Sequence, residues 1–319
     1  MIIPAYGRAN FLRESLRVLL SDYYHELDII VVDDGSPQVL QTELASEFRD
    51  LPVRFFRQSN SGTTAARNYG ASVAGGSYLL FIDDDDLFIP ESLNWRVDAL
   101  NRDPQAVAVA GRCRFLRDGR YDECQPKFTT KSLSHWDFLS GNRFYSPGQV
   151  LIRASAFHAS GGFRSEFNGS EDWEMWVRLA LLGSFIADDR LALDYRFHDG
   201  NYSQKVTLMC HTARRVVEEI SKSLCPAHIA IGRYLAYRYV STVYDNKLRS
   251  ALVAAISVND RETCTSVTRE IGFLTRATNG ACLSLKWALI RDHRRIRMSE
   301  HELNLIGQRC PDCAGRSLS

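Results

Sequence analysis

The stretch YLLFIDDDDLFIP, residues 78–90, sets four consecutive aspartates, Asp83, Asp84, Asp85 and Asp86, directly behind an apolar run. The run predicts a buried β-strand, because it is short, rich in aromatic and branched residues and bounded by polar ones. Adjacent carboxylates repel one another unless a positive group lies between them. The stretch therefore predicts a strand end that receives a cation, with a solvated acidic loop as the plainer alternative.

The residues on either side of this stretch alternate between short apolar runs and stretches with helical spacing. The apolar runs are MIIP (1–4), LDIIVVDD (27–34), VRFFRQ (53–58) and SYLLFIDD (77–84). The helical stretches between them are NFLRESLRVLLS (10–21), VLQTELASEFRD (39–50) and GTTAARNYGASVAG (62–75). This alternation predicts an α/β fold, with a mostly parallel sheet and helices on both faces.

Polar clusters follow three of the predicted strands, namely PAYGR (4–8), DDGS (33–36) and DDDD (83–86). In parallel sheets, ligands bind where the carboxyl ends of the strands meet the loops. Asp33 and Asp34 also fit a turn, since Asp-Gly-Ser is a favourable turn sequence. Two acidic strand ends in one sheet favour a shared ligand site over turn chemistry alone.

The second half of the chain changes from mixed structure to helices. AVAVAGRCRF (106–115), GQVLIRASAF (148–157) and LALDYRFH (191–198) predict strands, and EDWEMWVRLALLG (171–183) predicts a helix. Long helical patterns follow, such as TARRVVEEISKSL (212–224). We therefore expect a catalytic domain over residues 1–204 and a helical C-terminal extension over 205–319.

Composition limits the possible partners of the chain. Its 319 residues carry 39 Lys plus Arg against 38 Asp plus Glu, so no overall field favours nucleic acid. No apolar run approaches the ~18 to 20 residues of a membrane helix, and no basic leader precedes an apolar core. These features predict a soluble cytoplasmic protein, at most peripheral on the inner face of a membrane. MIIPAY reads as the end of a strand, so we expect residues before Met1 that complete it.

The eight cysteines are scattered, which favours reduced thiols. Cys310 and Cys313 form a CxxC without a second pair, so a solvated tail is favoured over a zinc site. The basic stretch KWALIRDHRRIRMS (286–299) has the charge to rest on an anionic membrane, although its thin apolar face favours a solvated surface or a partner helix.

The aspartate run suits a hard divalent cation, because Mg²⁺ and Mn²⁺ take oxygen ligands and are held by one or two carboxylates plus phosphates. Side chains alternate along an extended segment. We therefore expect Asp83 and Asp85 to point to one side and Asp84 and Asp86 to the other. Two DxD frames fit the run, and counting does not choose between them.

The order of motifs resembles that of the family 2 glycosyltransferases, nucleotide-sugar-dependent enzymes of the GT-A fold. The motifs are IIPAYGR, VVDDGS, GTTAARNYG, FIDDDDLFIP, GGF, EDWEMWVRLA and YRFHDGNYS, within residues 1 to about 204. The resemblance implies inverting transfer from a nucleoside-diphosphate sugar, most simply a UDP-sugar, to a hydroxyl of a glycan or lipid-linked acceptor in polysaccharide synthesis. It also implies a divalent cation, Mn²⁺ or Mg²⁺.

The resemblance assigns donor contacts to the strand ends. They comprise Pro4, Ala5 and Tyr6 under the base, Asp33 and Asp34 at the base or ribose, Arg67 at the base or diphosphate, and Asp83 and Asp84 on the donor side. A carboxylate accepts from a base N–H or a ribose hydroxyl, and an Arg fork matches phosphate oxygens. For Arg67 a structural surface role is the alternative.

The remaining assignments concern the metal, the base and the acceptor. Asp85 or Asp86 would ligate the cation, with His198 as a further metal or diphosphate contact. Asp172 would be the general base, although an acid in a first helical turn also stabilises the helix dipole. Gly162 of GGF, Glu171 and Trp173 would lie on the acceptor side, while helical spacing gives at least one of Trp173 and Trp176 to the core.

Three other classes share part of this pattern. A DxDx(T/V) phosphatase needs its aspartates on the first strand, followed by Thr or Val, whereas Leu87 and Phe88 follow here. A nucleotidyltransferase opens on a Gly-rich phosphate loop, which MIIPAYGRANF lacks. A catalytically silent sugar-nucleotide-binding domain would have lost the base or the DxD, and both are present.

Overall fold

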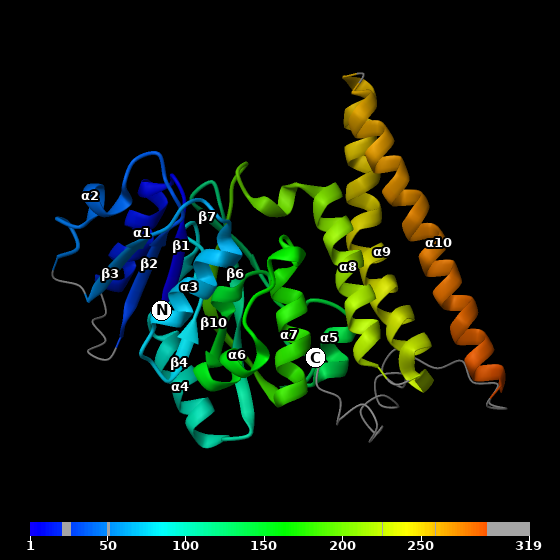
Figure 1. Cartoon of the computed structure of the whole chain (residues 1–319), viewed down its shortest axis with the longest axis horizontal. Helices are drawn as coiled ribbons and strands as arrows, with labels where there is room; N and C mark the ends of the chain where they lie inside the picture. The colour runs from blue at the N-terminus through cyan, green and yellow to red at the C-terminus, as the bar shows by residue number, and fades with distance from the viewer. Residues whose placement is uncertain (21–26, 50–51, 225, 259, 292–319) are drawn as a thin grey trace. The chain divides into compact units, whose positions relative to one another are not determined.

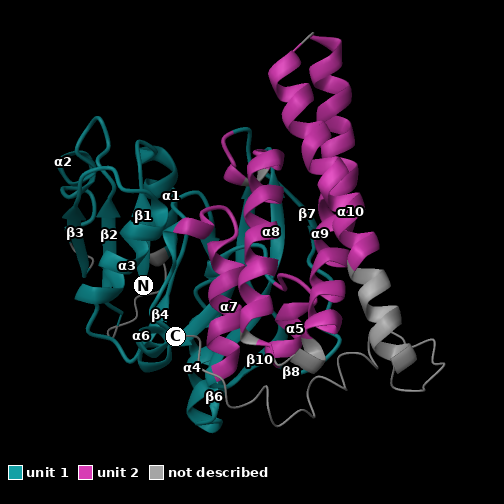
Figure 2. Ribbon diagram, turned by 45° about the vertical axis from the view of Figure 1, so that its right-hand side comes forward, with its two compact units in different colours: residues 1–133, 144–165, 182–199 teal, residues 134–143, 166–181, 200–319 magenta. Residues whose placement is uncertain are grey.

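The computed structural model describes residues 1–20, 27–49, 52–224, 226–258 and 260–291 (Figure 1). Cys310, Cys313 and residues 292–299 of the basic stretch lie outside the described residues. The chain divides into two compact units (Figure 2). Unit 1 comprises residues 1–133, 144–165 and 182–199, and unit 2 comprises 134–143, 166–181 and 200–319. The domain boundary at residue 204 stays a prediction.

Unit 1 contains two sheets. The described part of the first sheet has three parallel strands in the order β1 (Ile2–Ala5), β2 (Ile29–Asp33) and β3 (Val53–Arg57). The strands of the second are β4 (Tyr78–Leu80), β5 (Leu87–Phe88), β6 (Ala106–Arg117), β7 (Arg120–Cys124), β8 (Ser132–Leu133), β9 (Val150–Arg153) and β10 (Ser184–Phe197). A parallel bridge between Ile2 and Phe81 links the two sheets.

The second sheet is mixed rather than mostly parallel. Its central pair, β6 and β10, is parallel, whereas β4, β5, β7, β8 and β9 pair antiparallel to their neighbours. The strand expected over 148–157 ends at Arg153, because helix α6 (Ala154–Ser160) begins at the next residue. The α/β class is confirmed, and the carboxyl ends of β1, β2, β6 and β10 remain available for loops that carry polar groups.

Helices cover both faces of the first sheet, as its alternating side chains require. Leu12 and Leu16 of α1 (Ala9–Leu20) join Ile3 and Val31 in one buried cluster. On the opposite face, α3 (Thr63–Val73) packs so closely on β1 that a Cβ at Gly70 would come within 2.5 Å of Ile2. Helices α2 (Leu40–Leu44) and α4 (Ser92–Arg102) complete unit 1 together with α6.

Unit 2 is helical. It contains α5 (His135–Leu139), α7 (Glu171–Leu182, of which Leu182 falls in unit 1), α8 (Val206–Ser223), α9 (Pro226–Ser257) and α10 (Arg261–Arg291). Helices α9 and α10 run side by side as a long hairpin (Figures 1 and 2). No helix in the described part of the chain combines the length and the hydropathy that crossing a bilayer requires.

His135 makes the stability of unit 2 depend on pH. Burial lowers its pKa from 6.5 to about 4, although the hydrogen bond between Nδ1 and the Val177 carbonyl opposes this shift. The unfolded chain takes up a proton below about pH 6.5, and the folded chain resists it down to about pH 4. We therefore expect the free energy of unfolding to decrease as the pH is lowered through this window. At pH 5 the loss relative to neutral pH should be about 2 kcal/mol.

Denaturant unfolding of the wild type and His135→Asn at several pH values tests this expectation. Asparagine can still donate to the Val177 carbonyl but does not titrate in this range. The difference between the two pH profiles isolates the histidine from the carboxylates. Parallel pH profiles of the two proteins would show that His135 has the same pKa in the folded and the unfolded chain.

Candidate functional site

Asp33 at the end of β2 organises the loop that follows it. Its Oδ1 accepts the Ser36 N–H at 2.8 Å, and its Oδ2 accepts the Leu40 N–H and Arg57 Nη1 at 3.3 and 2.6 Å. Burial alone would raise the pKa of Asp33, but these donors and the Ser36 side chain hold the pKa below its ordinary value. Asp33 is therefore an ionised carboxylate whose oxygens already serve the loop.

Asp34 ties the first sheet to the loop before α3. Its Oδ1 accepts from Gln58 Nε2 and the Ser61 N–H at 2.7 and 2.8 Å, and its Oδ2 accepts the Gly62 N–H at 2.8 Å. Its own N–H donates to the Ala5 carbonyl. The carboxylate thereby holds the loop before α3 against the end of β2, and the backbone N–H joins the ends of β1 and β2.

The PAYGR segment turns out of β1 beside these aspartates. Pro4 and Ala5 are buried within β1, whereas Tyr6 is the first exposed side chain. Gly7 has a φ of +68° and donates its N–H to the Ser36 hydroxyl at 2.8 Å. Of the three residues assigned to the base, Tyr6 alone presents a large part of its ring to solvent.

The four aspartates form a tight turn, so the alternation expected for an extended segment is wrong. The Asp86 N–H donates to the Asp83 carbonyl at 3.1 Å. The Ser15 hydroxyl of α1 bonds the carbonyls of Asp84 and Asp86 at 3.2 and 2.8 Å. Because the backbone turns here, the carboxylates are directed to separate partners instead of to two opposite faces.

Every carboxylate of this aspartate turn faces a donor. Arg67 Nη2 lies 2.5 Å from Asp83 Oδ1, and the Arg196 N–H lies 3.1 Å from Asp86 Oδ1. The Arg8 guanidinium bridges Asp84 and Asp85, and His198 Nε2 lies 2.9 Å from Asp85 Oδ2. The structure thus brings together Asp83, Asp84, Asp85, Asp86, Arg67 and His198 from the sequence-based assignment, and it adds Arg8.

These partners do not fully compensate the negative charge. Burial raises the pKa of Asp84 to about 7, with smaller contributions from the charges of Asp85 and Asp83, and the Arg8 charge opposes this shift. Burial also raises the pKa of Asp86 well above its ordinary value. The charges of Asp85 and Asp83 are the next largest causes of this shift. Burial and the mutual repulsion of these carboxylates therefore oppose full ionisation of the turn.

The donor set at Asp85 suits a divalent cation that is shared with a ligand. Asp85 supplies carboxylate oxygens and His198 an imidazole nitrogen, both within reach of one another. In the described part of the chain, no group of three or more His, Cys, Asp or Glu is arranged to hold a metal alone. Mg²⁺ and Mn²⁺ commonly take their remaining ligands from phosphates and water. The residues therefore fit a cation completed by a diphosphate.

Gly162 belongs to a loop that is fastened to α3. Asn68 receives the Phe163 N–H at 2.9 Å and donates to the Phe163 carbonyl at 2.8 Å. Gly162 has a φ of +69°, and a Cβ there would lie 2.7 Å from Asn68 Oδ1. The Phe163 ring lies under the Arg67 guanidinium, 5.1 Å from its centre. The GGF loop thus helps to orient Arg67.

The predicted base lies in unit 2, at the beginning of α7. Asp172 Oδ2 accepts from Asn142 Nδ2 at 2.9 Å, and its Oδ1 accepts the Trp173 N–H at 2.7 Å. Glu171 Oε2 accepts the Gly169 N–H at 2.6 Å. Donors of this kind stabilise a charged carboxylate. The two donors thus hold the Asp172 carboxylate in one orientation.

Trp173 packs inside unit 2. Its side chain is 2% exposed, its Nε1 donates to the Phe138 carbonyl at 2.7 Å, and its ring lies 5.2 Å from that of Tyr239. Trp176 is buried as well. Both tryptophans are therefore core residues, and the indole of Trp173 has little exposed surface that could contact a sugar.

Two contacts escaped the sequence-based assignment. Arg8 lies inside the PAYGR segment, yet no spacing rule relates it to aspartates 76 and 77 positions away. Asn142 precedes Asp172 by 30 positions and carries no motif. Both contacts join segments that are distant in the chain, so no local signal could have found them.

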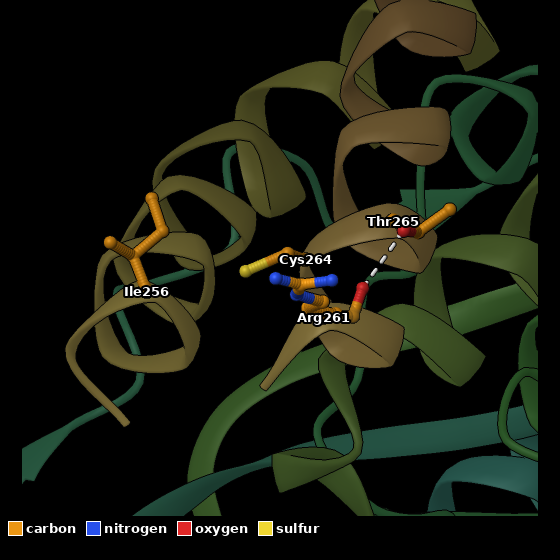
Figure 3. Close-up of a pocket in the computed structure, with 4 residues that line it drawn as sticks. All are labelled: Ile256, Arg261, Cys264 and Thr265. Carbon is orange, nitrogen blue, oxygen red and sulfur yellow. Dashed lines mark hydrogen bonds between the residues drawn. The ribbon is translucent and has the colours of Figure 1, made fainter. Parts of the chain in front are cut away.

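A pocket elsewhere in the chain lies at the ends of α9 and α10. It is lined by Ile256, Arg261, Cys264 and Thr265 (Figure 3). Its lining contains no carboxylate or imidazole that could hold a hard cation. The pocket therefore does not compete with the aspartate turn as a candidate site.

Comparison of the sequence with known proteins identifies its relatives. The family model "Glycosyl transferase family 2" matches residues 1–161. An uncharacterized glycosyltransferase of Rickettsia felis is 28% identical over 215 residues, which cover 65% of this chain and 35% of that protein. Glycosyltransferase GlyA of Streptococcus pneumoniae is 36% identical over 88 residues, which cover 27% and 12%. The chain spans about a third of the length of the first Rickettsia relatives.

Solved structures share the fold. TarS of S. aureus in complex with UDP-GlcNAc matches with a TM-score of 0.64 and 18% identity, covering 87% of this chain and 80% of that one. The mannosyltransferase PcManGT of Pyrobaculum calidifontis, in complex with GDP-Man and Mn²⁺, gives 0.55 and 16%, covering 91% and 85%. These similarities confirm the GT-A fold that the order of motifs predicts, with helices after it.

Proposed function

The chain belongs to the family 2 glycosyltransferases, and from this membership we propose that it transfers a sugar from a nucleoside-diphosphate sugar to a hydroxyl acceptor. The observation that carries the proposal is the aspartate turn of unit 1, where Asp85 faces His198 and Arg8. The buried carboxylates of the turn can bind a divalent cation, and Arg8 and His198 lie beside them, where they can contact a diphosphate bound to that cation. The neighbours solved with UDP-GlcNAc and with GDP-Man and Mn²⁺ support this ligand class.

We assign the donor nucleotide to the carboxyl ends of β1 and β2. Tyr6 offers a ring to the base, and Asp34 stands beside it, able to accept from a base N–H or a ribose hydroxyl if the loop donors rearrange. Arg67 and Arg8 supply guanidinium groups for the diphosphate oxygens. UDP is our first base assignment, since the uracil N–H can donate to a carboxylate, and GDP is the alternative because guanine carries such donors as well.

We propose Asp85 and His198 as ligands of Mn²⁺ or Mg²⁺, which favours the frame Asp83-x-Asp85. Arg8 pairs with both Asp84 and Asp85, but Asp84 is the more deeply buried of the two, and Asp86 is buried against the Arg196 N–H. Asp83 pairs with Arg67 and remains available on the donor side. When bound, the cation would stabilise the negative charge of the departing nucleoside diphosphate.

In the proposed reaction, the acceptor oxygen attacks the anomeric carbon from the side opposite the diphosphate. The new C–O bond forms as the bond to the diphosphate oxygen breaks, so the configuration inverts. Asp172 takes the hydroxyl proton onto a carboxylate oxygen. Asn142 holds that carboxylate in place. A glycan or a lipid-linked acceptor, on a polysaccharide pathway, is consistent with this chemistry.

A donor screen that detects released nucleoside diphosphate tests the proposal without knowledge of the acceptor. We expect slow hydrolysis of at least one UDP-sugar or GDP-sugar with Mn²⁺, reduced about a hundredfold by EDTA and restored by excess Mn²⁺. Calorimetry with UDP and GDP gives the matching affinities. If the protein with Mn²⁺ bound neither nucleotide, the proposed function would be wrong.

A further inference from the structure

Four aromatic rings gather on unit 1 in a cluster that the donor site does not use. We call Phe115, Tyr145, Tyr195 and Phe197 the aromatic platform. The Phe115 ring lies 5.0 Å from Tyr145 and 5.5 Å from Phe197, and Tyr195 lies 5.0 Å from Phe197. Tyr145 is 51% exposed, and the other three rings are half-buried. The platform therefore presents ring surface to solvent.

The register of the central strands produces this cluster. In the parallel pair β6 and β10, Phe115 lies opposite Tyr195, and Phe197 lies opposite Arg117. Residues two apart on a strand share a face, so Phe115 and Tyr195 continue the stripe begun by Cys113 and Leu193. Those two side chains are fully buried in the core. The platform is the end of a core stripe that reaches the surface at the carboxyl ends of both strands.

The chemistry around the platform is mixed, as at a sugar site. Arg117 extends over the Phe197 ring at 4.5 Å with an exposed guanidinium, and Tyr145 and Tyr195 carry hydroxyls. A plain core edge would hide its rings, whereas exposed aromatic faces rimmed by polar groups mark binding sites. A pyranose ring offers the complement, with an apolar C–H face for stacking and hydroxyls for the rim.

The platform is continuous with the aspartate turn. Phe197 immediately precedes His198, which faces Asp85 at 2.9 Å, and Arg196 donates its N–H to Asp86. Tyr145 immediately precedes Ser146, whose side chain interacts with the Asp86 carboxyl. Both approaches lie within unit 1. A sugar on the platform would thus lie next to the place where the diphosphate and cation are expected.

We propose that the aromatic platform binds a pyranose ring of the acceptor glycan by stacking against its C–H face. This inference rests on the proposed function and specifies its acceptor as a cyclic sugar. The donor nucleotide is assigned to the ends of β1 and β2, in the other sheet of unit 1, which leaves the platform for the second substrate. The transferred sugar of the donor has the same chemistry, and the experiment separates the two.

Saturation-transfer NMR on the full chain provides the test. The probes are methyl β-glucoside, methyl β-galactoside and methyl β-N-acetylglucosaminide, with ribitol as an acyclic polyol control. Mg²⁺ and UDP are added in a second series, because Mn²⁺ would broaden the signals. We expect transfer to the axial C–H protons of at least one glycoside, little transfer to ribitol, and no displacement by UDP-sugar.

Variants locate the binding surface. Tyr145→Ala and Phe197→Ala should each weaken glycoside binding about tenfold, whereas Tyr145→Phe keeps the ring and should stay within about twofold of wild type. Tyr121→Ala is the matched control, since Tyr121 is a 55% exposed tyrosine that contacts Arg114 instead of the platform. Melting curves of all four variants report on folding.

Three results would contradict glycoside binding by the platform. The first is the absence of a glycoside signal with the wild type, and the second is an equal loss of glycoside binding in Tyr121→Ala and Tyr145→Ala. The third is displacement of the glycoside by UDP-sugar but not by UDP. The last result would assign the platform to the donor sugar. UDP binding is followed in the same samples by its own signals. Loss of UDP binding with glycoside binding intact would contradict the proposed function and leave the platform standing.

Discussion

Replacing Asp172 by asparagine should lower the rate of sugar transfer by about a hundredfold to ten-thousandfold, the usual loss when a general base is removed. The amide keeps the size of the carboxylate and an oxygen for the Trp173 N–H, but it cannot accept the hydroxyl proton. The measurement is initial-rate transfer to an acceptor found by the glycoside screen. Nucleotide affinity should remain within about threefold, because in our proposal Asp172 does not bind the donor.

Asp245→Asn is the matched control for this variant. It makes the same chemical change on α9 of the same unit, where Asp245 forms an exposed i,i+4 pair with Arg249. Exposed pairs of this kind contribute little, so the control should transfer at the wild-type rate. Full transfer by Asp172→Asn would remove Asp172 from the mechanism, and its role would revert to stabilising the first turn of α7.

The general architecture was predictable because it depends on local patterns. Short apolar runs such as 27–34 and 77–84 became or adjoined strands, and the helical spacing of Leu12 and Leu16 placed both in the core. Polar residues after β1, β2 and β4 were correctly placed at strand ends. The mixed pairing of the second sheet was not predictable, since strand direction depends on the path of loops between distant segments.

Several contacts of the site depend on tertiary packing, which no single motif encodes. The alternation rule assumed an extended chain, but the bond between Asp86 N–H and the Asp83 carbonyl folds the run into a turn. Arg8 reaches the aspartates only because β1 and the end of β4 lie side by side. Trp173 fitted both a sugar contact and a core position, and its burial depends on Tyr239, 66 residues later in a helix without a motif.

Asp85→Asn should abolish cation-dependent donor binding, with a loss of about a hundredfold or more in Mn²⁺ affinity measured by electron paramagnetic resonance in the presence of UDP. Asparagine removes the charge that faces both Arg8 and His198. Asp85 is 7% exposed and lies between Arg8 and His198, so melting curves accompany the titration and separate loss of a ligand from loss of folding. Loss of metal binding without loss of folding is the signature of a ligand.

Asp86→Asn makes the same change one residue later and decides between the two frames. Asp86 is buried, and burial raises its pKa well above the ordinary value, so asparagine resembles the neutral form that burial favours. If Asp83-x-Asp85 is the metal frame, this variant should keep Mn²⁺ affinity within about tenfold. If instead Asp86→Asn lost the cation while Asp85→Asn retained it, the frame would be Asp84-x-Asp86. Because burial raises the pKa of Asp86, a cation bound there would compete with a proton, and Mn²⁺ affinity would rise with pH.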